Sequence, residues 1–362
     1  MFLAWKEIIY SKTRFSLIIG IVVLVAYLVS FLTGLANGLA QENKDAVDKW
    51  QADSIVLAEE SNLSLNMSML TLDDADTIAA DQKAVLGISS NIVRLESSES
   101  SEDNIDVTIF GIKMNEFLVP EIVEGKAVNE QGEVIADLSL KEEKGIEIGD
   151  ILNISGKESS LKVVGFTDKA KFSVSPVLYT QLDTYQDISS ANRSADSQDQ
   201  INAIILRDER PAEEIEINNS ALTVYSIDEF VNNLPGYNAQ VLTFGLMIGF
   251  LILIAALVIG IFIYVLTLQK ASMIGVMKAQ GISSNYISKS IIAQTLILAL
   301  LGVLIGFGLT ILTGLFLPAA VPYQNNYIFL AAVMAGLLVF ALLGAVFSVR
   351  TIVKVDPLVA IE

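Results

Sequence analysis

Four long apolar stretches divide this chain of 362 residues. The first runs from Phe15 to Leu35, and the others cover about 240–268, 291–317 and 327–349. None of the four contains Asp, Glu, Lys or Arg, and the breaker-rich "PAAVPYQNN" separates the last two. A helix of roughly 20 apolar residues crosses about 30 Å of hydrocarbon. The pattern therefore predicts four transmembrane helices.

The polar region between the first two stretches, residues 41 to about 235, reads as a mixed domain. "NIDVTIFGI", "GIEIGDILNI", "SLKVVGFTD" and "INAIILRD" are short runs rich in Val and Ile and bounded by Gly, Asn and Asp, which indicates strands. Helical patterns flank them: Val47 and Trp50 lie three apart, and Ser226 with Glu229 forms a capping box. We expect these two helices to stand on the membrane as a stalk.

Basic residues outside this region gather at three places in the sequence. The same places contain eight Lys and Arg but only three acidic residues, Glu7, Asp356 and Glu362. The eight are Lys6, Lys12, Arg14, Lys270, Lys278, Lys289, Arg350 and Lys354. The positive-inside rule puts both termini and the loop between helices 2 and 3 in the cytoplasm. The predicted fold is a membrane protein with four transmembrane helices and a large α+β extracytoplasmic domain inserted between helices 1 and 2. A cleaved signal peptide is the alternative for helix 1, although the apolar run exceeds the usual length.

Composition excludes several kinds of function. The formal charge of −18 argues against a nucleic-acid partner, because binding phosphate needs a basic face. The chain has no Cys and no His, which rules out a Ser-His-Asp triad and metal sites built on imidazole or thiolate. We therefore predict no catalytic residue, no metal ligand and no intrinsic cofactor.

The chain also lacks the phosphate-binding motif of ATPases. "ISGKES" contains Gly-Lys, but Ile151 stands where the first Gly of that motif belongs and Glu158 follows the lysine. The predicted spans contain no carboxylate that would mark a proton relay. Energy for any transport must then come from a partner protein.

The order of these parts resembles the FtsX/MacB-like permeases of type VII ABC systems over the whole chain. The stretch "EGKAVNEQGEVIADLSLKEEKGIEIGDILNISGKESSLKVVGF" (124–166), the loop "MIGVMKAQG" and the tail "VDPLVAIE" are similar to that family's motifs. Met273 stands where relatives commonly carry Glu. Within the family, "MFLAWKEIIYSKTRFSLI", "LTGLANGLAQEN" and "GVMKAQGIS" resemble the permeases of Gram-positive haem-efflux systems.

The resemblance implies a homodimeric permease paired with two copies of a separate cytosolic ABC ATPase, embedded in membrane lipid in the cell membrane of a Gram-positive bacterium. It implies no enzymatic activity in this chain and haem as the transported ligand. The expected domains are a cytoplasmic N-terminus with helix 1 (1–40), the MacB-like domain with stalk helices (41–235), helix 2 (236–268), a cytoplasmic coupling segment (269–290), helices 3 and 4 (291–349) and a cytoplasmic tail (350–362).

The coupling segment carries Met273, Val276 and Met277 at helical spacing, which predicts a short helix that docks on the ATPase. Gly275 and Lys278 belong to the same predicted contact, and Gly281 suits the position that ends such a helix. The alternative is a tight polar loop whose lysines only obey the positive-inside rule.

Haem is flat and apolar apart from two propionates, so we expect it near the outer ends of helices 1 and 2. Candidate residues at that depth are Tyr27, Phe31, Asn37, Glu42 and Tyr237. Tyr237 and Glu42 are the predicted iron contacts, since phenolate can ligate haem iron. Tyr27 and Phe31 are expected to stack on the ring. The alternative is an ordinary interfacial aromatic belt.

Gly34 and Gly38 on helix 1 are four residues apart, a spacing that permits close helix approach. We predict a dimer seam there; the alternative is a groove that packs against helix 2 of the same chain. Two other functions stay open. One is a mechanotransmitting permease that activates a cell-wall hydrolase, and the other is the export or sensing of antimicrobial peptides.

Overall fold

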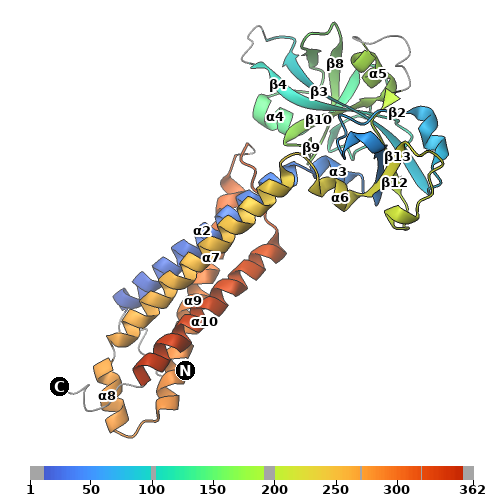
Figure 1. Ribbon diagram of the computed structural model, residues 1–362. Helices are drawn as coiled ribbons and strands as arrows, with labels where there is room; N and C mark the ends of the chain where they lie inside the picture. Colours follow the sequence, from blue (N-terminus) through green and yellow to red (C-terminus); the bar gives the residue numbers. More distant parts are fainter. Residues whose placement is uncertain (1–11, 99–102, 191–199, 270, 319, 354–362) are drawn as a thin grey trace. The chain divides into compact units, whose positions relative to one another are not determined.

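The computed structural model describes residues 12–98, 103–190, 200–269, 271–318 and 320–353. The chain forms two compact units (Figure 1). We call Met1–Gly38 with Leu242–Glu362 the helical unit, and Leu39–Val241 the α+β unit. The predicted basic positions Lys6, Lys270 and Lys354, and the tail "VDPLVAIE", lie outside the described residues.

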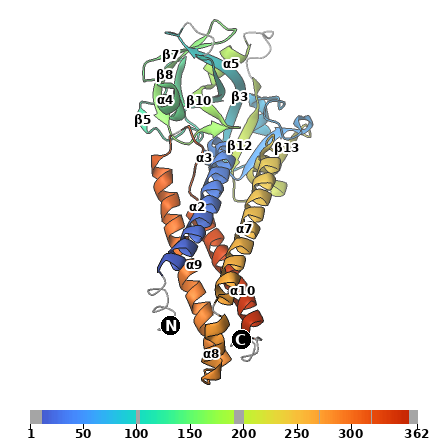
Figure 2. The same cartoon turned by 90° about the vertical axis from the view of Figure 1, so that its left-hand side faces the viewer.

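Five helices make up most of the helical unit: α2 (Lys12–Glu42), α7 (Tyr237–Leu268), α8 (Ala271–Ala279), α9 (Ser284–Phe316) and α10 (Tyr327–Val353). Within the described residues, α2, α7, α9 and α10 are long and apolar enough to cross a membrane. These four helices run side by side in both views (Figures 1 and 2). The prediction of four spans is confirmed.

Small residues bring the long helices close together. A Cβ on Gly302 of α9 would lie 2.5 Å from Cγ1 of Val22 on α2. A Cβ on Gly344 of α10 would lie 3.0 Å from Cα of Gly260 on α7. Because lipid tails are as apolar as the helices, close van der Waals packing has to hold such a bundle together.

The α+β unit lies between α2 and α7 in the sequence, as predicted. Its helices are α3 (Asp45–Lys49), α4 (Ser139–Lys144), α5 (Leu182–Ser190) and α6 (Ile227–Asn232). Its strands are β1 (Ser54–Ala58), β2 (Leu70–Thr71), β3 (Gln82–Leu95), β4 (Ile105–Ile112), β5 (Glu124–Gly125), β6 (Glu133–Asp137), β7 (Ile151–Ile154), β8 (Ser160–Thr167), β9 (Lys171–Phe172), β10 (Ser175–Gln181), β11 (Gln200–Ile201), β12 (Ala203–Arg207) and β13 (Leu222–Ser226). The four segments predicted as strands correspond to β4, β7, β8 and β12.

The main sheet closes on itself. Starting from β3, the neighbours are β4, β10, β6 and β8 in turn. β7 then pairs with both β8 and β3, which completes a ring of strands (Figure 2). Most pairs are antiparallel, but β10 with β4 and β6 with β8 are parallel. On the other edge of β3, the sheet continues through β12 and β1 to β13.

The segments predicted as stalk helices are instead short helices packed into this unit. Val47 and Trp50, at and just after α3, are each 1% exposed, and Phe230 of α6 is fully buried. The Trp50 ring stacks on that of Phe230 at 6.4 Å. Their apolar side chains find partners in the unit's own core, so neither segment extends as a free stalk.

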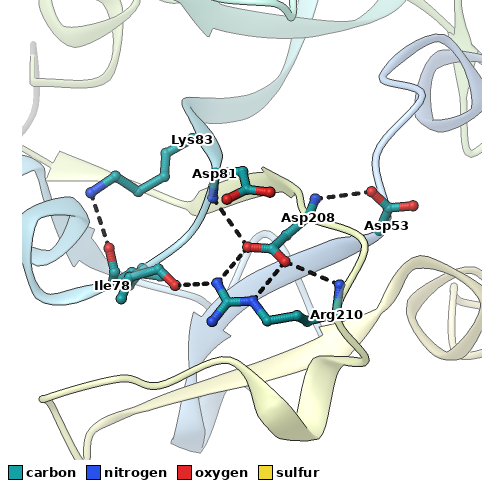
Figure 3. Close-up of polar contacts among 7 residues, drawn as sticks. Asp53, Ile78, Asp81, Lys83, Asp208 and Arg210 are labelled. Atoms are coloured by element: carbon teal, nitrogen blue, oxygen red, sulfur yellow. Dashed lines mark hydrogen bonds and ion pairs between the residues drawn. The ribbon is translucent and has the colours of Figure 1, made fainter.

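Asp208, just after β12, forms hydrogen bonds with residues at the ends of several strands (Figure 3). Its carboxylate accepts hydrogen bonds from the Arg210 guanidinium at 2.6 and 2.9 Å and from the backbone N–H of Asp81 at 3.1 Å. Its own N–H donates to the Asp53 carboxylate at 3.0 Å. Arg210, as the main partner, lowers the pKa of Asp208. The contacts join the ends of β1, β3 and β12.

Candidate functional site

The C-terminal half of α2 carries a row of aromatic rings. Phe31 stacks on Tyr27 with centroids 5.8 Å apart, and on Tyr323 of the α9–α10 segment with centroids 5.6 Å apart. The Tyr27 hydroxyl lies 3.2 Å from the hydroxyl of Thr313 on α9. Two of the predicted haem-binding residues are thus neighbours, and the third ring comes from a residue that the sequence analysis did not select.

The segment around Tyr323 lies along the glycine face of α2. The N–H of Gln324 donates to the carbonyl oxygen of Gly34 at 3.2 Å, and Asn37 Nδ2 donates to the Gln324 carbonyl at 3.3 Å. A Cβ on Gly34 would overlap the Tyr323 ring, and one on Gly38 would overlap the backbone of Pro322. These glycines therefore permit a close approach within one chain, and the dimer seam predicted at them stays a prediction. The close approach is to this segment rather than to helix 2.

Glu42, at the end of α2, is held by an ion pair inside the α+β unit. Its carboxylate lies 3.0 Å from Lys171 Nζ, which also lies 3.4 Å from Glu143, and the Glu42 side chain is only 13% exposed. Burial lowers the pKa of Lys171, but the two carboxylates outweigh burial and raise it overall. The N–H of Val174 caps α2 by donating to the Glu42 carbonyl at 3.2 Å.

Tyr237, at the start of α7, is half-buried against the core that surrounds Trp50. The neighbouring Gln240 accepts a hydrogen bond from the Asn43 amide at 3.1 Å. The five predicted haem contacts therefore divide between the units. Tyr27, Phe31 and Asn37 belong to the helical unit, and Glu42 and Tyr237 to the α+β unit.

The predicted coupling segment forms α8, which folds back against the start of α9. Gly281 has φ 87° and stands at the C′ position of α8, where the N–H of Ile282 donates to the Met277 carbonyl at 3.0 Å. The Ser283 hydroxyl caps α9 by accepting from the N–H of Tyr286. Buried Ile274 and Ile287 hold the two helices together.

This packing divides the predicted coupling residues into two groups. Met273 is 56% exposed and Val276 is 45% exposed, so both are free for a partner. Met277 instead packs against the Ile274–Ile287 pair, and Gly275 is buried. Met277 therefore faces α9, which differs from its predicted place on the docking face.

The described residues of the helical unit also contain a small, largely apolar cavity with two polar residues in its wall, which the sequence pattern did not indicate. Gln294 and Thr295 of α9, each 5% exposed, line it together with apolar residues of α2 and α7. Its volume is about 30 Å³. Two adjacent polar residues inside a predicted span were the available signal. No group of His, Cys, Asp or Glu within the described residues is arranged to hold a metal ion.

Two family models match the chain. Residues 15–216 match the MacB-like periplasmic core domain, and residues 245–357 match the FtsX-like permease C-terminal. The putative hemin transport system permease protein HrtB of Staphylococcus haemolyticus is 26% identical over 362 residues, covering 100% of this chain and 99% of its own length. The protein of the same name from Staphylococcus epidermidis is 28% identical over 363 residues with the same coverage.

Solved structures that resemble the chain cover about half of it. The periplasmic region of MacB from Actinobacillus actinomycetemcomitans is 14% identical, with a TM-score of 0.35 over 49% of this chain and 90% of its own. The extracellular domain of the ABC-type transporter YknZ from Gram-positive bacteria is 13% identical, with a TM-score of 0.33 over 48% of this chain and 98% of its own.

Proposed function

Because the chain belongs to the permease family that joins a MacB-like periplasmic core domain to an FtsX-like C-terminal domain, we propose that it is the membrane subunit of an ABC exporter that extrudes haem. The full-length relatives named as putative hemin transport permeases support this cargo. The observation that carries the proposal is the aromatic face of α2, where Tyr27 and Phe31 stack inside an apolar span.

Haem suits this face because it is flat, largely apolar and soluble in a bilayer. Aromatic side chains bind such a ring by offset stacking and by burial of apolar area. Asn37, one to two turns further along α2, offers an amide to a propionate. The proposed iron contacts are Tyr237 and Glu42, and Glu42 would first have to leave Lys171. Haem is cargo here, so no resident cofactor is required.

Energy would come from a separate cytosolic ATPase, present in two copies for a permease dimer. The exposed Met273 and Val276 of α8 form the proposed docking face. Moving a two-state equilibrium from 1:99 to 99:1 takes about 5.5 kcal/mol of differential binding, which sets the scale that ATPase docking must reach. A dimer seam at Gly34 and Gly38 would require residues 322–324 to leave that face first.

Growth in haem tests the cargo. We expect a strain lacking this permease to stop growing at haem concentrations that the parent tolerates, and to retain more cell-associated haem. The intact gene should restore both properties, whereas a gene encoding Phe31→Ala should restore them only in part. Equal growth of the deletion strain and its parent across the whole concentration series would exclude haem efflux.

One observation favours the second candidate, a permease that transmits force to a cell-wall hydrolase. Met67 and Met69 are 69% and 59% exposed on a loop of the α+β unit, which the buried Asn202 amide fixes by donating to the carbonyls of Leu65 and Ser68. Rigidly presented methionines suit a protein-binding surface. In that case, the deletion strain would form unseparated chains of cells without becoming sensitive to haem.

A further inference from the structure

The ring of Tyr323 fills a narrow slot between α2 and α9. Phe31 covers one face of the ring, with an interplanar angle of 24°. Glycines lie where other residues would place a side chain: a Cβ on Gly314 would lie 2.5 Å from Cε1 of the ring, and one on Gly34 would overlap it. The slot is therefore aromatic on one side, glycine-lined at its edges, and shaped for a flat ring.

Few and long hydrogen bonds hold the segment that carries this ring. The contacts of Gln324 with α2 measure 3.2 and 3.3 Å, at the long end of the usual range. The Tyr323 hydroxyl donates to the side-chain oxygen of Asn325, which is on the same segment, at 2.8 Å, and lies 3.4 Å from the carbonyl of Thr310 on α9. Asn326 is held more firmly, because its side-chain oxygen and its carbonyl accept from the N–H groups of Phe329 and Leu330 on α10 at 3.1 and 2.9 Å. Releasing residues 321–325 therefore costs little in hydrogen bonds to the helices.

The chain around Tyr323 can move without unwinding a helix. α9 ends at Phe316 and α10 begins at Tyr327, and Pro318 and Pro322 lie between them. Proline cannot continue a helix, so this connection stays irregular. An irregular segment changes its backbone angles more cheaply than a helix, which would lose its internal hydrogen bonds.

We propose that residues 321–325 are a lid and that the Tyr323 ring occupies the place of a flat aromatic cargo on Phe31. The inference rests on the proposed function and adds to it a residue that controls entry. The cargo and the Tyr323 ring compete for the same face of Phe31. The apparent affinity of the protein for the cargo is therefore reduced in proportion to the time that the ring fills the slot. Export requires the segment to leave the slot and return.

Porphyrin binding by the purified full-length protein in lipid nanodiscs tests the competition. The probes are hemin and metal-free protoporphyrin IX, followed by absorbance and by fluorescence. Tyr323→Ala should bind both about tenfold more tightly than the unaltered chain, because nothing then competes for Phe31. Tyr323→Phe, which keeps the stacking ring, is the matched control and should stay within about twofold. Equal affinities of Tyr323→Ala and the unaltered chain would overturn the lid.

A reversible lock tests whether the segment must move. The chain has no cysteine, so Asn37→Cys with Gln324→Cys creates a single pair at contacting positions. Joining the pair with a short bifunctional thiol reagent that reducing agent cleaves should abolish porphyrin binding and haem efflux, and cleavage should restore both. The reference is the same double variant before joining, so any loss caused by replacing Asn37 itself is present on both sides of the comparison. Gln324→Cys alone, treated in the same way, should remain active. Full binding and efflux by the joined protein would contradict the proposal.

The two experiments separate failure of the lid from failure of the proposed function. If cells export haem through the permease while the joined pair still works, the lid is wrong and haem export stands. If the deletion strain tolerates haem but Tyr323→Ala gains porphyrin affinity and the joined pair loses it, the lid stands and the cargo is another flat aromatic amphiphile.

Discussion

At the start of α3, the Asp45 side chain is buried among other acids. The residue is 5% exposed, and burial raises its pKa to about 6 despite a hydrogen bond from Gln41, with Asp48, Glu42 and Asp137 adding to the increase. The folded form therefore binds a proton more tightly than the unfolded chain does. The contribution of this protonation to the free energy of unfolding is fully present below about pH 4 and is lost as the pH rises through about 6.

Asp45→Asn should stabilise the protein at neutral pH. A shift from 3.8 to about 6 corresponds to roughly 3 kcal/mol at most, since one pKa unit is worth about 1.4 kcal/mol. We expect a higher melting temperature at pH 7.5 and a gain that shrinks toward pH 4. Glu60→Gln is the control, because Glu60 is exposed and is not among the residues that shift the pKa of Asp45. A gain for Asp45→Asn that is equal at both pH values would show that its charge is not the cause.

At the scale of single residues, the sequence pattern singled out Tyr27, Phe31 and the two glycines of α2 but not Tyr323, which packs against Phe31 and Gly34. The roles of the selected residues in binding and dimerisation stay predictions. The sequence pattern around Tyr323 indicates only a break between two helices. Tyr323 also lies 289 positions after Gly34 along the chain. A contact between such distant positions leaves no local pattern. The polar "PYQNN" between two apolar spans was the available signal.

At the scale of elements, the α8–α9 hairpin shows how packing sorts residues that a helical pattern cannot. Spacing places Met273, Val276 and Met277 on neighbouring parts of one helix surface. Only the fold of α8 onto α9 decides that Ile274 and Met277 face inward. Gly281 and Ser283, by contrast, follow from local rules: a positive φ ends one helix, and a hydroxyl caps the next.

Val276→Asp should uncouple the permease from the proposed ATPase subunit. The side chain is 45% exposed, so the change should alter stability by no more than about 0.5 kcal/mol, while placing a charge in the proposed apolar contact. We expect at least about a tenfold loss of ATP-driven haem efflux from proteoliposomes, with unchanged haem binding.

Two further variants serve as controls for Val276→Asp. Val276→Ile keeps the apolar surface and should retain efflux. Met277→Asp should lower the melting temperature, because it puts a charge among Ile274 and Ile287. Efflux by Val276→Asp at the rate of the unaltered protein would place the ATPase contact elsewhere.

At the scale of the whole molecule, the α+β unit has the features of an independent domain. It contains two apolar clusters of its own, one of them around Trp50 and Phe110. Its ends meet, since Asn43 donates to Gln240 at 3.1 Å. A domain with its own core and adjacent termini folds without the rest of its chain.

A soluble fragment of residues 43–240 should therefore fold. We expect a mixed α/β circular dichroism spectrum and one cooperative thermal transition. Trp50→Ala in the same fragment should cost about 3–5 kcal/mol, because it leaves a cavity where the side chain is 1% exposed. A broad, non-cooperative transition of the unaltered fragment would mean that the unit needs α2 and α7 to fold.

The sequence by itself determined the four spans, the inserted α+β domain, its main strands and the hairpin around Gly281. Each of these follows from local composition, periodicity or backbone conformation, which act over a few turns of chain. Only the tertiary structure decided that the sheet closes through β7, that α3 and α6 pack into the core, and that Tyr323 fills the glycine slot of α2. These features join residues far apart in sequence, and burial and shape, rather than local preference, select such contacts.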